Sequence, residues 1–340
     1  MHISFHHNPK AFLCFAVLAL VVGQASAQSF IPEIHGTIRA KYEYEPSIGE
    51  GRFEIRNARL SVEGKVLPIV SYKAEIDLSD EGQIKMLDAY VRLTPKKQLK
   101  ITAGQMRVPF TIDAHRSPHL QYFANRSFIA KQVGNVRDVG AAVGYTFPTR
   151  CPITLEGGVF NGSGLTNQKN YWTSDYNYSL KAQMMIENHF NITLSTQKAR
   201  YNGTYAWMYD AGAYWQADRW HIEAEYLRKR YAHNSFKDVN AINAFAAYRL
   251  PLNNTFSGIS FLGRYDYMSD HSTGKPDDNG DLKADDPVRH RATAGVTLSM
   301  GTPKLQADIR LNYEQYFYCH NAVPAISEQN KLVVEFVCHF

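Results

Sequence analysis

Residues 34–44 carry the sequence IHGTIRAKYEY, in which two kinds of side chain alternate. Apolar or small residues occupy the even positions from Ile34 to Tyr44, whereas polar and mostly charged residues occupy the odd positions from His35 to Glu43. A period of two indicates a β-strand whose two faces meet different surroundings. At about ten residues or more, the strand is also longer than those of most soluble sheets.

The same alternation recurs along the chain and predicts about sixteen strands, although one miscounted hairpin would make the number 14 or 18. The predicted strands cover residues 33–44, 52–65, 70–79, 84–94, 99–107, 138–147, 152–160, 177–187, 190–199, 207–216, 220–230, 238–250, 257–268, 288–300, 304–317 and 331–340.

A soluble sandwich also alternates, so other features must distinguish it from a membrane barrel. The strands are long enough to cross a bilayer at a tilt, and Tyr and Phe recur near their ends, as in an aromatic girdle. The chain stops in a strand that ends on the aromatic Phe340. Hydrocarbon offers edge groups no partner, so the sheet must close. The sequence predicts an all-β fold, a transmembrane antiparallel β-barrel in the bacterial outer membrane, and sixteen strands leave room for water inside.

The first residues have the pattern of an export signal. Lys10 precedes an apolar run at 11–22, and Ala25-Ser26-Ala27 supplies small residues for cleavage. We interpret residues 1–27 as a signal peptide and residues 28–340 as a single outer-membrane β-barrel domain. The run is too short for a membrane-spanning helix.

Composition limits the function classes. Of the 340 residues, 44% are hydrophobic, 13% aromatic and 20% charged, which is too apolar for a disordered chain. A formal charge of +5 argues against a nucleic-acid partner. No Walker-type loop or G-x-S-x-G elbow occurs, and we predict no catalytic residue, cofactor or bound metal.

Four segments together resemble the phosphate-selective porin O and P family. They read RNARLSVEG at 56–64, LDAYV at 87–91, GQMRVPF at 104–110 and FNG at 160–162. The resemblance implies a 16-stranded homotrimeric porin whose third outer loop folds into the lumen, where cationic side chains guide small anions, phosphate among them.

Charged side chains of the strands should face water inside the barrel, because a Lys or Arg facing lipid near the midplane costs about 2–4 kcal/mol. Arg39, Arg59 and Lys73 are therefore predicted lumen-wall residues. Acidic residues share their phase, so ordinary ion pairing across strands is the alternative for each of them.

The candidate constriction is the long connection 109–137, which we predict to be the inward-folding third outer loop. Arg107 at its entrance and Arg116, Arg126 and Lys131 within it are the predicted selectivity residues, since Arg presents paired donors to oxyanions. The alternative is that such side chains only pin the loop to the wall.

These features predict an outer-membrane porin for passive diffusion of small hydrophilic solutes, with a preference for anions. Two alternatives stay open: an outer-membrane barrel enzyme of the lipase or protease kind, whose triad would come from distant strands, and a non-conducting adhesin barrel.

Overall fold

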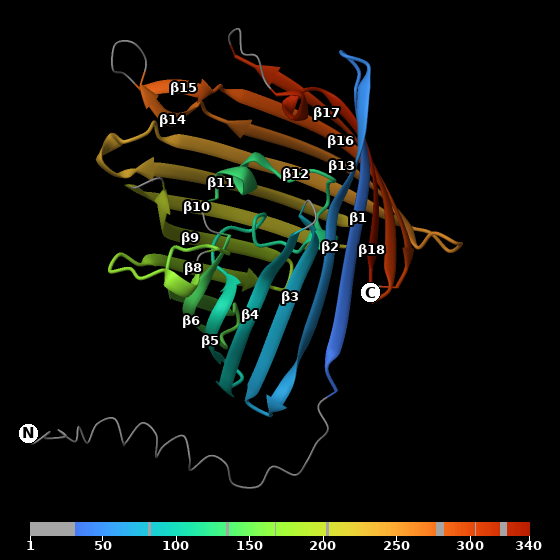
Figure 1. The fold of residues 1–340 in the computed structure, drawn as a ribbon. Helices are drawn as coiled ribbons and strands as arrows, with labels where there is room; N and C mark the ends of the chain where they lie inside the picture. Colours follow the sequence, from blue (N-terminus) through green and yellow to red (C-terminus); the bar gives the residue numbers. More distant parts are fainter. Residues whose placement is uncertain are drawn as a thin grey trace, which may run out of the picture.

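The computed structural model describes residues 31–80, 83–133, 136–166, 168–201, 204–276, 282–302, 304–319 and 325–340. In these ranges, sixteen antiparallel strands form one closed barrel (Figure 1). The barrel strands are β1 (Glu33–Glu45), β2 (Glu50–Leu67), β3 (Val70–Asp80), β4 (Gln83–Lys96), β5 (Leu99–Arg107), β6 (Arg137–Phe147), β7 (Ile153–Phe160), β8 (Asn177–Ile186), β9 (Phe190–Tyr201), β10 (Thr204–Ala217), β11 (Trp220–Tyr231), β12 (Val239–Pro251), β13 (Gly258–Met268), β16 (Arg289–Gly301), β17 (Gln306–Tyr318) and β18 (Lys331–His339).

The predicted all-β barrel and its number of strands are confirmed, and the predicted strand limits differ from the observed ones by a few residues. Strands adjacent in sequence pair with each other around the barrel, except that β13 pairs with β16 and that β1 pairs with β18 to close the barrel. Between those two, β14 (His271–Pro276) and β15 (Leu282–Asp286) form a separate two-stranded sheet that the sequence pattern did not predict.

Short helices occur in the connections between barrel strands. They are η1 (Pro118–Leu120), α2 (Phe128–Gln132), η2 (Gln168–Asn170), η3 (Ala232–Asn234) and η4 (Ile326–Glu328). No helix in the described ranges is long and apolar enough to cross a membrane. The predicted signal peptide, residues 1–27, lies outside the described residues.

The barrel buries its polar side chains and exposes its apolar ones, the reverse of a soluble core. In β11, Trp220, Ile222 and Tyr226 are exposed, whereas Glu223 and Glu225, on the opposite phase, are buried. Because the sheet is closed, the buried phase faces the interior and the exposed apolar phase faces outward. A sheet of this kind is stable where hydrocarbon surrounds it and polar groups fill the inside.

Exposed aromatic residues occur toward both ends of the strands. Tyr145, Phe147 and Trp220 lie toward the end of the barrel that carries the turns at 148–152 and 218–219, and Trp207 and Phe317 lie toward the opposite end. This distribution is typical of the aromatic girdles at the two membrane interfaces.

The barrel closes where β1 meets β18, drawn in blue and red at its right side (Figure 1). The backbone N–H of Gly36 donates to the Phe340 carbonyl at 2.7 Å, and the Phe340 N–H donates back at 3.0 Å. The Phe340 ring lies over Gly36, where an added Cβ would come within 2.1 Å of it. Any larger residue at this position would therefore require the Phe340 ring to move.

Candidate functional site

The connection between β5 and β6, residues 108–136, contains η1 and α2. Its local structure follows from its sequence, since Ser117 precedes Pro118 at the start of η1 and the Ser127 Oγ accepts the Ala130 N–H at the start of α2. The Asp113 carboxylate in turn accepts the Ser127 hydroxyl at 2.5 Å. Serine caps and a proline in the first turn are regular helix starts.

Arg39 and Asn312 attach this connection to one part of the wall. From β1, Arg39 donates to the Gln121 Oε1 at 2.6 Å and to the Ala124 carbonyl at 2.8 Å. From β17, the Asn312 Oδ1 accepts the Ala124 N–H at 2.8 Å. Arg39 also forms a buried ion pair with Glu335 of β18, at 2.6 Å. The charged phase of these strands therefore holds residues 121–124.

A second set of contacts attaches the start of the same connection to β8, β9 and β11. The Glu225 carboxylate accepts the N–H groups of Ile112 and Asp113. The Lys181 Nζ donates to the Thr111 carbonyl at 2.9 Å, and the Ser195 Oγ accepts the Thr111 N–H at 3.1 Å. In the strand order of the barrel, these strands lie far from β1 and β17.

Two arginines of β13 and β16 hold the segment that leads into α2. Arg264 donates to the Asn125 carbonyl at 2.9 Å and Arg291 donates to the Arg126 carbonyl at 2.7 Å. Both guanidinium groups also pair with Asp266, each at 2.8 Å. Glu314 also contacts both guanidinium groups, so two carboxylates balance the two cations. The backbone position is thus fixed with little free charge.

Arg107 and Arg116, two of the predicted selectivity residues, anchor the connection. Arg107 donates to the carbonyls of His115, at 2.6 Å, and of Arg116, at 3.1 Å. The Arg116 guanidinium pairs with Asp113 at 3.1 Å and with Glu223 of β11 at 2.5 Å. Both geometries are those of the alternative reading, in which the side chain pins the loop to the wall.

Lys131 and Arg126 differ in their pairing. Lys131 lies on α2 and pairs with Glu328 at 2.5 Å. Arg126 donates only to the Ala114 carbonyl, at 3.4 Å, and forms no ion pair with a carboxylate among the residues described. Arg116 and Lys131 thus have carboxylate partners, whereas Arg107 and Arg126 contact only backbone carbonyls among the residues described.

Like charges surround Arg126. Burial lowers its pKa to about 10; Asp113 opposes the change, while Arg59, Arg56 and Arg137 reinforce it. A pKa of about 10 leaves the guanidinium charged at neutral pH. Like Arg107, Arg126 is therefore a cation without a paired carboxylate among the residues described, and it lies in the field of three further arginines.

The three predicted wall residues all have carboxylate partners. Arg39 is only 1% exposed and is fully engaged by Glu335 and the connection. Arg59 pairs with Asp77 at 2.9 Å and with Glu75 at 3.3 Å, and Lys73 pairs with Glu63 at 3.2 Å.

Arg59 and Lys73 nevertheless line open space. A cavity of about 240 Å³ lies between them and residues 117–119, and a neighbouring cavity of about 480 Å³ shares Glu63 and Lys73 with it. His119 lines the smaller cavity, and its ring stacks on His339 at 3.8 Å between centroids. Burial, followed by the charges of His339 and Arg310, lowers the pKa of His119 to about 4.

Arg56 belongs to this charged cluster although the alternation pattern did not select it. A β-bulge between Arg39 and Ala40 shifts the pairing, so that Arg39 faces Asn57 and Ala40 faces Ile55. Arg56 is the extra residue of the bulge, and its phase cannot be assigned by counting. Only the pairing register of β1 and β2, which the alternation pattern does not reveal, places Arg56 in this cluster.

The comparisons with known proteins agree with this geometry. A family model described as "Phosphate-selective porin O and P" matches residues 36–248. None of the curated protein sequences compared with the chain matches it.

Solved structures of outer-membrane channels share the fold at low sequence identity. The outer membrane channel DcaP of Acinetobacter baumannii superimposes with a TM-score of 0.62 at 12% identity, over 94% of this chain and 100% of that one. An anion-selective porin from Comamonas acidovorans gives 0.59 at 11% identity, over 92% and 99%. The trimer form of OmpT from Vibrio cholerae gives 0.59 at 10% identity, over 92% and 99%.

Proposed function

Since the chain belongs to the phosphate-selective porin O and P family and is therefore an outer-membrane porin, we propose that its channel passes small hydrophilic solutes with a preference for anions. Because this family consists of porins, the porin function replaces the two alternatives that the sequence left open, a barrel enzyme and a non-conducting adhesin.

We propose further that residues 108–136 cross the barrel interior and form its constriction. Two sets of contacts support this proposal. Arg39 and Asn312 hold residues 121–124 from β1 and β17, whereas Glu225 holds Ile112 and Asp113 from β11. All of these wall side chains are buried and belong to the inward phase of the sheet. A segment bound from both sides in this way narrows the passage between them.

Arg126 carries the proposal of anion preference. Most of the inward-facing cations that the structure describes pair with carboxylates, so they contribute little net potential. Arg126 lacks such a partner and lies near Arg56, Arg59 and Arg137. In a narrow, partly dehydrated site, a mobile anion from solution would provide the missing countercharge.

Arg59 and Lys73 extend the proposed anion path along the wall, because both line the smaller cavity beside residues 117–119 and Lys73 also lines the larger one. Their acidic partners Glu63 and Glu75 line the same space. The path is therefore of mixed charge, and an anion would be attracted at Arg126 and released more easily along the wall.

Phosphate is the oxyanion that the family description names, and guanidinium groups bind oxyanions through two parallel donors. We also propose a homotrimer, on the grounds of the family and of the trimer form described for OmpT from Vibrio cholerae, together with a cleaved signal peptide at 1–27 and one barrel domain at 28–340. Cross-linking of the purified porin tests the trimer. Mass spectrometry of its N-terminal peptide tests cleavage after residue 27 and therefore the start of the barrel domain.

The test of the main proposal is the reversal potential of single channels in planar bilayers under a potassium chloride gradient. We expect a potential whose sign reports faster permeation of chloride than of potassium, and addition of phosphate to one side should reduce the chloride current. A cation-selective reversal potential would overturn the proposed anion preference, and the absence of any conductance would overturn the open passage.

A further inference from the structure

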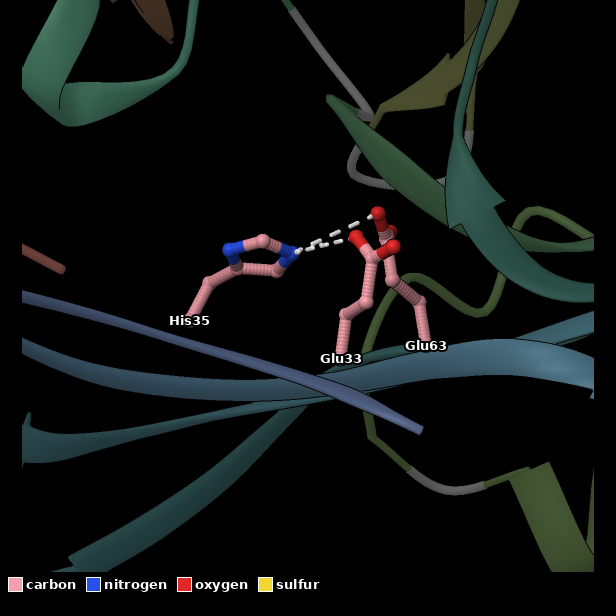
Figure 2. A group of neighbouring side chains, drawn as sticks. All are labelled: Glu33, His35 and Glu63. Carbon is pink, nitrogen blue, oxygen red and sulfur yellow. Dashed lines mark ion pairs between the residues drawn. The ribbon is translucent and has the colours of Figure 1, made fainter. Parts of the chain in front are cut away.

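Glu33, His35 and Glu63 form a compact group at the end of the barrel where β1 begins. Figure 2 shows their side chains converging, with both carboxylates directed toward the same imidazole nitrogen. Their placement follows from the sheet, because Glu33 and His35 alternate on one face of β1 and Glu33 is the direct cross-strand partner of Glu63 on β2. Facing residues of adjacent strands have Cβ atoms about 5 Å apart.

The distances are longer than those of a hydrogen-bonded ion pair and are close to those between two ligands of one metal ion. The His35 Nε2 lies 3.7 Å from the Glu33 Oε2 and 3.5 Å from the Glu63 Oε1. A charge-assisted hydrogen bond would be about 2.8 Å long. Two ligands bound at about 2.0–2.2 Å at a tetrahedral angle lie about 3.3–3.6 Å apart. The 3.5 Å separation lies within this range, and the 3.7 Å separation lies just above it.

The surroundings favour this geometry. The second oxygen of Glu63 contacts the Lys73 Nζ at 3.2 Å, which leaves the Oε1 directed at His35. One imidazole and two carboxylates form a mixed donor set whose charge of −2 balances a dication. Both glutamates line the cavity of about 480 Å³, from which water could complete the coordination.

We propose that Glu33, His35 and Glu63 bind one divalent transition-metal ion of the zinc class, with water as the fourth ligand. Imidazole and carboxylate ligands suit Zn²⁺ and Co²⁺, and a site with three protein ligands keeps one position open. Bound at the mouth of the barrel, the ion would neutralise two carboxylates that lie beside the proposed anion path.

The test is Zn²⁺ titration by calorimetry, with Co²⁺ absorption as a second probe of tetrahedral coordination. It uses the mature porin in detergent, purified without a histidine tag and treated with a chelator. Cys151, Cys319 and Cys338 are free cysteines, so their thiols are alkylated first. We expect one ion per chain and a tetrahedral Co²⁺ spectrum.

His35→Ala and, separately, Glu63→Gln should each weaken Zn²⁺ binding by about tenfold or more. His189→Ala is the matched control, because His189 is an exposed turn residue whose ring contacts the Gln216 carbonyl, and it should bind as the parent does. Equal binding by the parent and by His35→Ala, or no saturable binding by the parent, overturns the proposal. Because binding is measured in detergent, the result is independent of ion selectivity.

Discussion

Replacement of Arg126 by Gln removes a lumen cation that has no carboxylate partner among the described residues, and it should reduce anion selectivity. The change leaves the backbone anchors of the connection in place, since Arg291 binds the carbonyl of residue 126 rather than its side chain. The side chain itself makes one hydrogen bond, to the Ala114 carbonyl at 3.4 Å. We therefore expect an effect on permeation with little loss of structure.

The size of the effect follows from electrostatics. A unit charge on an anion about 4 Å from the guanidinium is stabilised by about 1 kcal/mol in bulk water and by about 4 kcal/mol at an effective dielectric constant of 20. The lower figure alone corresponds to a factor of about five in permeation. Arg56, Arg59 and Arg137 remain in the variant, and each has a carboxylate partner. We expect the anion-to-cation permeability ratio to fall about fivefold.

The assay compares reversal potentials of single channels in a salt gradient, at low and at high ionic strength. Arg230→Gln is the matched control, because it makes the same charge change on an exposed side chain of β11 that pairs with Asp238 at the outer surface. High salt should reduce the difference between Arg126→Gln and the parent, since it screens the charge. Equal reversal potentials for Arg126→Gln and the parent at low salt would refute the reasoning.

Three further substitutions test the fold and the anchored connection. Gly36→Ala forces the ring of Phe340 aside and should destabilise the barrel by about 1–3 kcal/mol, which is measured as a lower unfolding temperature on heated gels. Gly263→Ala is the control, because its added methyl group meets no neighbouring atom and should leave the unfolding temperature unchanged. Arg39→Met removes two hydrogen bonds to the connection, each worth about 1.5–3 kcal/mol, and should increase the noise of the open channel; unchanged noise contradicts the anchoring role. The pKa of His119 is lowered to about 4, so the unfolded chain binds a proton at this residue at higher pH than the folded chain does. The stability of the parent should therefore decrease relative to that of His119→Gln as the pH falls from about 6.5 to 4, measured by thermal unfolding. Parallel stability curves of the two proteins against pH would exclude this linkage.

The ion pairs at the predicted site show which features could not be predicted from the sequence. Alternation placed Arg39, Arg59 and Lys73 on the inward face, and all three have carboxylate partners there. It could not distinguish Arg126 from Arg116, because both are single arginines in the same connection. Their difference depends on Glu223, which is far away in sequence and near in space.

The sequence by itself determined the barrel. Each strand must present one face to hydrocarbon and the other to polar surroundings. The alternation that meets this requirement lies within a single short segment, as in residues 34–44, so each strand can be predicted from its own sequence. The tertiary structure alone decided which cations are neutralised and that Glu33, His35 and Glu63 converge. Those outcomes depend on register and on the bulge at Arg39, where one extra residue changes which side chains face each other.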